Sequence, residues 1–276
     1  MNLSWFESIL YGFISGITEF LPLSSSAHQE ISLLLFGAEQ RDPVRDFVVH
    51  IGMLIVLIFT YKSMLEQLQR TKAQRSFRSG YEFVSKQRMD VRFMRSAALP
   101  MLICLIALTY IFRSANGNLL MISGFLLLNG ILLFVPGRML QGNKDSRAMS
   151  QLDGVLIGGF SGLGALTGVS RIGCFTGLSI ARGADRQQAL QWAIILSVPA
   201  LVLLSFLDVL QMFSVGDIPF WRSFFTYLLS GASACTGGFC GLKLARLIMA
   251  RAGFSGFAYY SWGVALLLFI LYLFAV

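Results

Sequence analysis

Long apolar stretches constrain the fold of this chain more than any other feature of its sequence. They cover residues 96–112, 117–135, 187–210, 223–242 and 254–276. Crossing a hydrocarbon core of about 30 Å takes roughly 20 apolar residues, and these stretches are of that order. Backbone polar groups cannot stay unpaired in lipid, so such segments form helices or a closed barrel. The stretches lack the alternation of barrel strands, and the sequence therefore predicts an all-α integral membrane protein.

The positively charged residues of the chain lie mainly between the apolar stretches. The net charge is +8, although only 13% of the residues are charged. Lys and Arg gather between the apolar stretches, in residues 62–95, 138–148 and 243–253. Such clusters mark the cytoplasmic side of a membrane protein and lie against anionic lipid. We therefore interpret the charge as a topology signal with no nucleic-acid partner, and we place both termini and residues 211–221 outside.

An internal repeat is visible in two segments of the sequence. Residues 12–59 align with residues 158–205 without a gap, so that Gly12, Ser15, Gly16, Ser24, Gly37 and Ala38 fall on Gly158, Ser161, Gly162, Ser170, Gly183 and Ala184. The basic loops place the end of the first copy and the start of the second on the same side. The copies therefore run in opposite directions across the membrane. In inverted repeats with broken helices, the site usually lies where the breaks meet.

The repeat and the loops divide a single membrane domain, residues 1–276, into five parts. These are repeat one with a re-entrant hairpin (12–61), a basic cytoplasmic loop (62–95), a transmembrane hairpin (96–135), repeat two with its own re-entrant hairpin (152–210) and a C-terminal transmembrane hairpin (222–276).

The breaks that produce the re-entrant hairpins can be located from turn and cap residues. In LPLSSSAH, Pro22 ends one helix and the serines from Ser24 to Ser26 are favoured N-caps for the next. The second copy uses glycines in the turn from Gly168 to Gly173. Irregular backbone at membrane depth is tolerated only inside protein or beside a wet cavity. The breaks are therefore expected to meet inside the protein.

Three ionisable side chains, Glu19, His28 and Arg171, lie within these apolar segments. Such groups are costly in a membrane and are functional hypotheses by default. One alternative is that Glu19 and Arg171 form only a structural ion pair between the hairpins. A serine-capped helix start beside an arginine is, however, an anion site. A serine such as Ser25 near a histidine and a carboxylate is also the arrangement that activates a hydroxyl.

Two further polar positions are expected to support the fold. His50 follows Asp46 by one helical turn, and we predict that the two pair and that His50 supports the site without a catalytic role. Asn129 and Gln191 lie at membrane depth and are expected to bond neighbouring helices.

Several motifs resemble those of one known family, the undecaprenyl pyrophosphate phosphatases of the bacitracin-resistance type. GFISGITEFLPLSSSAH resembles the first signature of the family, DFVVHIG its His-x-Gly segment, and TGVSRIG its second signature, Pro-Gly-x-Ser-Arg-Ser-Gly. The SVPA at residues 197–200 also fits, and the resemblance covers nearly the whole chain. This chain departs from the family pattern by carrying Ser15 in place of a carboxylate, Thr167 for Pro, Ile172 for Ser, Phe175 for Thr and Gln191 for Glu.

The resemblance implies both a fold and a reaction. The fold is an inverted repeat of about six transmembrane helices plus two re-entrant hairpins. The reaction is hydrolysis of undecaprenyl pyrophosphate at the outer face of the bacterial cytoplasmic membrane, assisted by Mg²⁺ or Ca²⁺. By position, the resemblance makes Ser25 the nucleophile, His28 and Glu19 the proton-handling residues, Glu19 the cation ligand, Ser24, Ser26, Gly168, Ser170, Arg171 and Gly173 the substrate-binding residues, and His50 and Ser15 supporting residues.

Alternatives to hydrolysis stay open at this point. A relative without hydrolase activity would use the same side chains to bind or translocate a polyprenyl phosphate, and an inverted repeat suits that role too. A structural or regulatory membrane protein is a third class. The expected partners are the polyprenyl pyrophosphate and the surrounding membrane lipids, and a homodimer is left open.

Overall fold

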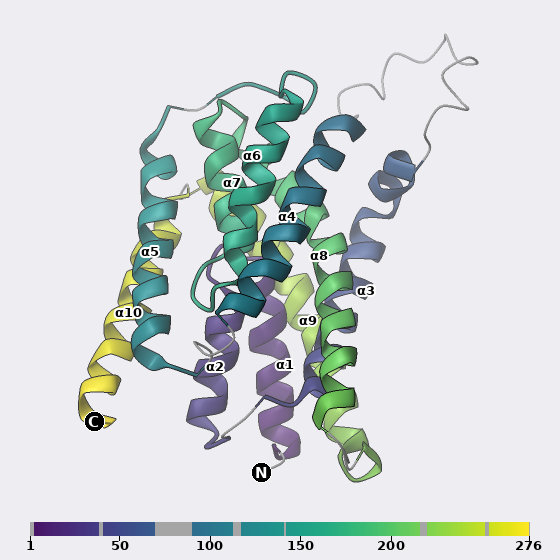
Figure 1. Cartoon of the computed structure of the whole chain (residues 1–276), viewed down its shortest axis with the longest axis vertical. Helices are drawn as coiled ribbons and strands as arrows, with labels where there is room; N and C mark the ends of the chain where they lie inside the picture. Colours follow the sequence, from purple (N-terminus) through teal and green to yellow (C-terminus); the bar gives the residue numbers. More distant parts are fainter. Residues whose placement is uncertain are drawn as a thin grey trace.

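The structure is a computed structural model, and it describes residues 3–38, 41–69, 90–112, 117–140, 142–215, 220–251 and 254–275. These residues form ten α-helices and one short 3-10 helix (Figure 1). In chain order they are α1 (Trp5–Glu19), α2 (Ser25–Leu35), α3 (Pro43–Gln69), α4 (Val91–Ile111), α5 (Leu119–Arg138), α6 (Gln151–Ser161), η3 (Gly162–Ala165), α7 (Arg171–Ala181), α8 (Arg186–Val215), α9 (Phe220–Arg251) and α10 (Gly256–Ala275).

Long apolar helices confirm the prediction of an all-α, multi-pass membrane protein. Among the described residues, α3, α4, α5, α8 and α10 are long and apolar enough to cross a membrane. The sixth long helix, α9, contains the predicted span 223–242 but is less apolar than the other five. Its middle carries small and polar residues from Ser230 to Gly238, several of which are in close contact with α1.

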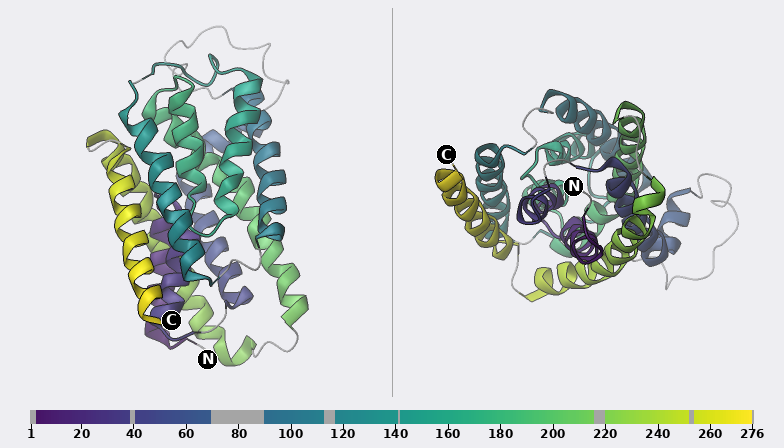
Figure 2. Two further views of the ribbon diagram at one scale, coloured as in Figure 1. Left: turned by 60° about the vertical axis from the view of Figure 1, so that its left-hand side comes forward. Right: turned by 90° about the horizontal axis from the view of Figure 1, so that it is seen from below.

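The two re-entrant hairpins are the α1–α2 pair and the α6–α7 pair. Their helices have 15 residues in α1 and 11 in each of the others. At 1.5 Å per residue these helices are about 16–22 Å long, which is too short to cross the bilayer. The two tips approach each other near mid-height of the molecule (Figure 1). Seen from below, α1 and α2 lie inside a ring of the longer helices (Figure 2).

The start and the end of each hairpin are fixed by equivalent residues in the two repeats. Ser4 and Ser150 each form a capping box with an acid three residues later, and these boxes begin α1 and α6. The second helix of each hairpin ends at a glycine with positive φ, 65° at Gly37 and 90° at Gly183. The offset of 146 residues that relates Gly12 to Gly158 also relates both of these pairs. The repeat therefore begins before the segment predicted from the sequence.

The two repeats interlock, because each re-entrant hairpin packs on a long helix from the other half of the chain. Helix α1 packs along α9, and its counterpart α6 packs along α4. A Cβ atom added at Gly12 would lie 2.0 Å from the carbonyl oxygen of Ser230, and one at Gly158 would lie 2.0 Å from that of Ala97. The glycine-bearing helices thus approach their partners closely, and only a residue without a side chain fits there.

In the predicted transmembrane hairpins, 96–135 and 222–276, the two helices of each pair pack mainly on other elements and not on each other. The main contacts of α4 are with α6 and η3, whereas α5 packs against α10 and α7. Helix α9 likewise packs against α1 and α3, and α10 packs against α5. The physical reason is that the α6–α7 hairpin lies between α4 and α5 (Figure 1). Helices α4 and α5 are therefore separated by the re-entrant hairpin that follows them in the chain.

The predicted loops fall at the two ends of the bundle. Both termini lie at one end of the bundle, together with the C-terminal end of α8 and the N-terminal end of α9 (Figure 1). The connection from α5 to α6 lies at the other end. The centre of the basic loop, residues 70–89, and residues 216–219 lie outside the described residues. Which end faces the cytoplasm stays a prediction from the charge pattern.

Candidate active site

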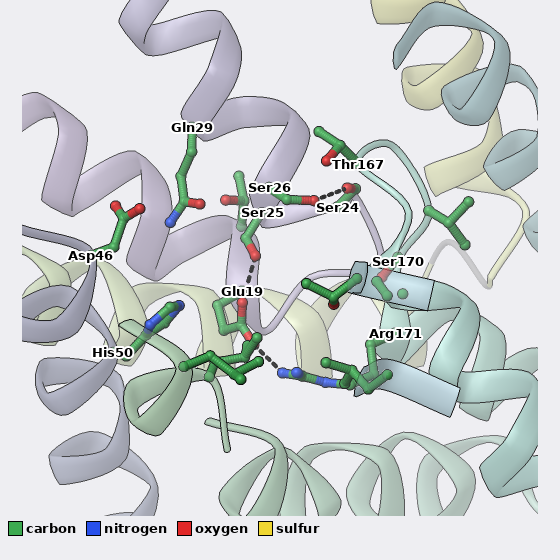
Figure 3. Close-up of a pocket in the computed structure, with 18 of the residues that line it drawn as sticks. Glu19, Ser24, Ser25, Ser26, Gln29, Asp46, His50, Thr167, Ser170 and Arg171 are labelled. Atoms are coloured by element: carbon green, nitrogen blue, oxygen red, sulfur yellow. Dashed lines mark hydrogen bonds and ion pairs between the residues drawn. The ribbon is translucent and has the colours of Figure 1, made fainter. Parts of the chain in front are cut away.

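A cavity of about 210 Å³ lies where the tips of the two hairpins meet (Figure 3). Its wall combines the turn of the first hairpin, the turn of the second, and side chains from α3, α4 and α8. This is the position that the inverted repeat predicted for the site. The lining also includes Gln211, near the C-terminal end of α8, and that helix runs to the end of the bundle that carries both termini.

The turn of the first hairpin holds a strained residue, Ser24. Its φ is +67°, and it is the one non-glycine residue with positive φ in the described part of the chain. Such a conformation costs on the order of 1–3 kcal/mol and requires support from its surroundings. The support comes from Gly168, whose N–H donates to Ser24 Oγ at 3.1 Å, and from His28 Nδ1, 2.8 Å from the Ser24 carbonyl oxygen.

Two helix N-termini face the cavity from opposite hairpins. Ser24 caps α2 and Ser170 caps α7, each by accepting a hydrogen bond from the backbone N–H three residues later. The next two residues of each helix, Ser25–Ser26 and Arg171–Ile172, line the cavity. Helix N-termini carry partial positive charge and unpaired N–H groups. The predicted serine N-cap at Ser24 is confirmed, and the two helix ends bring to the cavity the features that favour an anion.

Glu19 bonds its own hairpin through one carboxylate oxygen and the second hairpin through the other. Ser25 donates from Oγ to Glu19 Oε2 at 2.5 Å, and Arg171 donates from Nη2 to Glu19 Oε1. The Glu19 side chain is only 6% exposed. The Nε–H of Arg171 is buried and has no hydrogen-bond partner among the described residues. The structure thus brings Glu19, Ser25 and Arg171 together, as predicted, and adds to the ion pair a hydroxyl and a free donor.

His28 does not face the cavity, in contrast to the prediction that it handles the Ser25 proton. Its Nδ1 lies 2.8 Å from the Ser24 carbonyl oxygen, and its Nε2 lies 2.9 Å from the hydroxyl of Tyr260 on α10. The ring also stacks on Tyr260, with 5.7 Å between the ring centroids. Both ring nitrogens are therefore engaged outside the cavity. His28 fixes the strained turn and ties it to α10.

His50 lines the cavity, but its predicted pairing with Asp46 is wrong. His50 Nδ1 lies 2.6 Å from Asp208 Oδ2 on α8. Asp46 instead accepts a hydrogen bond from Tyr11 at 2.5 Å and lies 3.7 Å from Arg41. Although Asp46 and His50 are one turn apart on α3, each has a partner on a different element. Sequence reasoning missed Asp208, although an acid in the apolar run LSFLDVLQ met the rule that identified Glu19.

Three other predicted site residues have structural roles. The Gly168 N–H is bonded to Ser24, and the Gly173 N–H donates to Ser170 Oγ at 3.0 Å, so neither amide is offered to a ligand. Ser15 donates to the Tyr11 carbonyl oxygen at 2.6 Å, within α1. Gly168 and Gly173 build the turn and cap of the second hairpin, and Ser15 satisfies its own helix.

Asn129, in the middle of α5, fixes both hairpin tips. Its Oδ1 accepts a hydrogen bond from the backbone N–H of Ser170 at 2.9 Å. Its Nδ2 donates to the carbonyl oxygen of Pro22 at 3.3 Å and to Ser261 at 3.0 Å. These bonds confirm the prediction that Asn129 joins neighbouring elements.

The donors around Glu19 do not form a metal cage of their own. No group of three or more His, Cys, Asp or Glu side chains is arranged to hold a metal ion within the described part of the chain. Both oxygens of Glu19 are already engaged by Ser25 and Arg171. A hard cation requires about six oxygen ligands, so at this position it would depend on oxygens from substrate and water.

Comparison with known proteins places the chain in one family. The family model described as "Bacitracin resistance protein BacA" matches residues 8–267. The chain is similar to the undecaprenyl-diphosphatase of Thermodesulfovibrio yellowstonii, with 28% identity over 271 residues and 98% of each chain covered. It is also similar to that of Alkaliphilus metalliredigens, with 29% identity over 273 residues, covering 94% of this chain and 95% of the relative. The match extends from α1 to α10 and includes both hairpins, and the chain therefore belongs to the BacA family of bacitracin resistance proteins.

Proposed function

We propose that this protein hydrolyses undecaprenyl pyrophosphate to undecaprenyl phosphate and inorganic phosphate. The observation that carries the proposal is the group of Glu19, Ser25 and Arg171, which lies in a cavity between two opposed helix N-termini. This group combines a hydroxyl, a carboxylate in contact with it and a free arginine donor. The relatives in the comparison, which bear the name undecaprenyl-diphosphatase, support the identity of the substrate.

The cavity supplies two kinds of donor for a pyrophosphate. Backbone amides at Ser25–Ser26 and Arg171–Ile172 lie at helix starts, where phosphate is favoured. The Arg171 guanidinium keeps its Nε–H free while Nη2 bonds Glu19. An anion that takes this N–H satisfies a buried donor. The unpaired donor supports binding of a phosphate group beside the Ser25 hydroxyl.

The contact between Ser25 and Glu19 supports a covalent route. Ser25 Oγ attacks the terminal phosphorus, and its proton passes to Glu19 Oε2. The bond from that phosphorus to the bridging oxygen breaks, and undecaprenyl phosphate leaves. Water then attacks the phosphoryl group on Ser25, the P–Oγ bond breaks, and phosphate is released. Glu19 returns the proton to Ser25 Oγ, and one water molecule has been consumed.

The divalent cation predicted from the family resemblance stays a prediction. Glu19 is its proposed protein ligand, and substrate oxygens and water would complete its shell. When bound, the cation would neutralise charge on the pyrophosphate. Because the described residues form no cage for it, none of the steps above is assigned to the cation.

We place the reaction at the outer face of the bacterial cytoplasmic membrane. The cavity lining includes Gln211, near the C-terminal end of α8, and that helix runs to the end of the bundle that carries both termini. The basic loops predicted to be cytoplasmic belong to the opposite end, as at the α5–α6 connection. Lys and Arg clusters favour the cytoplasm, which supports an outward-facing site.

The purified protein in detergent provides the direct test. Undecaprenyl phosphate and inorganic phosphate are both measured from undecaprenyl pyrophosphate, in Mg²⁺, in Ca²⁺ and in excess chelator. We expect equal amounts of the two products, and rates at least ~100-fold lower for Ser25→Ala and Glu19→Gln. Full activity in chelator would remove the cation from the proposal. Tight lipid binding by the wild type without either product would favour the translocation alternative.

A further inference from the structure

A second hydrogen-bonded pair, His50 and Asp208, borders the cavity outside the group formed by Glu19, Ser25 and Arg171. His50 comes from α3 and Asp208 from α8, and both residues line the cavity. Nδ1 of the imidazole lies 2.6 Å from Oδ2 of the carboxylate. The two side chains are 11% and 14% exposed. They are therefore largely shielded from solvent but open to the cavity.

The carboxylate determines which nitrogen of His50 holds the proton. Asp208 accepts a hydrogen bond from Nδ1–H, which leaves Nε2 with a free lone pair. Figure 3 shows the His50 ring on the same side as Asp46, with Glu19 between His50 and Arg171. The chain has only two histidines, and His28 is bonded to Ser24 and Tyr260. His50 therefore provides the imidazole of this cavity.

The proposed reaction needs a second base. After the first half-reaction, Glu19 holds the proton from Ser25 and must keep it until Ser25 leaves phosphorus. A different group must therefore accept the proton of the attacking water. Asp46 is already bonded to Tyr11 and paired with Arg41. An imidazole held in the correct tautomer by a carboxylate is suited to this task.

We infer that His50 is the general base of the second half-reaction and that Asp208 is its positioning residue, an inference that rests on the proposed function. His50 Nε2 takes a proton from water as the water oxygen attacks the phosphoryl group on Ser25. The P–Oγ bond breaks, and Glu19 gives its proton to Ser25 Oγ. The imidazolium then releases its proton to the departing phosphate or to solvent.

The charges around His50 favour the imidazolium that this step forms. Asp208 on α8, Asp46 on the same helix and Glu19 on α1 are the acids that line the cavity together with the ring. Arg41, near the start of α3, lies beside Asp46 and also lines the cavity. The neighbouring acids stabilise a positive ring, and Asp208 does so through a direct hydrogen bond.

Rapid-quench kinetics test the inference with substrate labelled at the terminal phosphate. The variants are His50→Gln, which removes the base, and Asp208→Asn, which keeps the side-chain size but loses the anionic acceptor. We expect His50→Gln to form undecaprenyl phosphate in a first turnover, to release phosphate at least 100-fold more slowly, and to leave the label on Ser25. Asp208→Asn is expected to slow phosphate release at least tenfold and to alter its pH profile.

A comparison variant separates this role from a general disturbance of the site. His28→Gln loosens the turn at Ser24, so we expect it to slow both half-reactions together without trapping label on the protein. If purified His50→Gln is not monodisperse, the rate of phosphate release by Asp208→Asn provides the test instead. His50→Gln within threefold of wild type, or a slow variant without labelled Ser25, would overturn the assignment. A wild type that forms neither product would instead refute the proposed function.

Discussion

At the scale of single residues, Arg171 shows best how the site combines structure with chemistry. One nitrogen of its guanidinium bonds Glu19, and another, Nε, has no partner among the described residues. A lysine has a single ammonium and cannot serve both positions. We expect Arg171→Lys to stay folded and to bind the lipid pyrophosphate at least tenfold more weakly, which is about 1.4 kcal/mol. Binding is measured by titration of the purified variant, and unchanged affinity would contradict the role in substrate binding.

Asn129 provides a second test at this scale, because its side chain is fully buried and bonds both hairpin tips. Asn129→Ala leaves the Ser170 N–H and the Pro22 carbonyl without partners. Each unsatisfied buried group costs about 1–3 kcal/mol. We therefore expect a lower unfolding temperature together with a loss of activity.

Asn118→Ala is the matched control for Asn129→Ala. It removes the exposed N-cap of the same helix, α5, at a cost of about 1 kcal/mol. Because Asn118 is distant in sequence from both tips and does not line the cavity, its loss should leave the activity intact. Equal effects of the two variants on activity would refute the role of Asn129 at the tips.

The sequence predicted the site residues whose chemistry is unusual for their surroundings. Glu19 and Arg171 stand out as charges in apolar runs, and Ser25 stands out beside a proline break. Which histidine lines the cavity was not predicted, because the direction of a side chain depends on its tertiary partner: His50 lines it and His28 does not. His28 is held by Tyr260 and His50 by Asp208, and both partners lie more than 150 positions away in the chain. Local spacing contains no information about such pairs.

At the scale of helices, the glycine contacts between α1 and α9 and between α6 and α4 give a quantitative prediction. Gly12→Ala and Gly158→Ala each place a methyl group against a backbone carbonyl oxygen of the partner helix. Overpacking of this kind costs about 1–3 kcal/mol. We expect both variants to unfold at lower temperature or lower denaturant concentration, by similar amounts, because the positions are equivalent.

Gly263→Ala is the control for these variants. Gly263 also lies within a helix, α10, but nothing lies within 4 Å of the added Cβ atom. Alanine is favoured over glycine in a helix by about 0.5–1 kcal/mol, so this variant should be neutral or stabilising. Destabilisation of Gly263→Ala equal to that of Gly12→Ala would show that the close approach is not the cause.

Helix ends were predictable, whereas helix packing was not. Pro22 and the serine caps follow from backbone chemistry, and the aligned glycines revealed the inverted repeat. The description of residues 96–135 as a hairpin, however, implies that its two helices pack against each other. The re-entrant hairpin of the second repeat lies between α4 and α5, and the apolar periodicity of a helix does not specify which apolar neighbour it contacts.

At the scale of the whole molecule, the orientation in the membrane can be tested at two exposed positions. We expect Ser214→Cys, at the end of α8, to react with an impermeant thiol reagent added to intact cells. Ala148→Cys, between α5 and α6, should react only after the cells are opened. Both are placed in a background without the four native cysteines. The reverse pattern would invert the topology and move the cavity to the cytoplasmic side.

The interlocking of the repeats has a consequence for biosynthesis. The partner of α6 is α4, which the ribosome has already completed, but the partner of α1 is α9, which begins about 200 residues later in the chain. At about 5–20 residues per second, α1 waits roughly 10–40 s for α9. During that time the α1–α2 hairpin, with its buried Glu19, lacks the helix that will enclose it. The α1–α2 hairpin therefore stays without its packing partner until α9 has been synthesised.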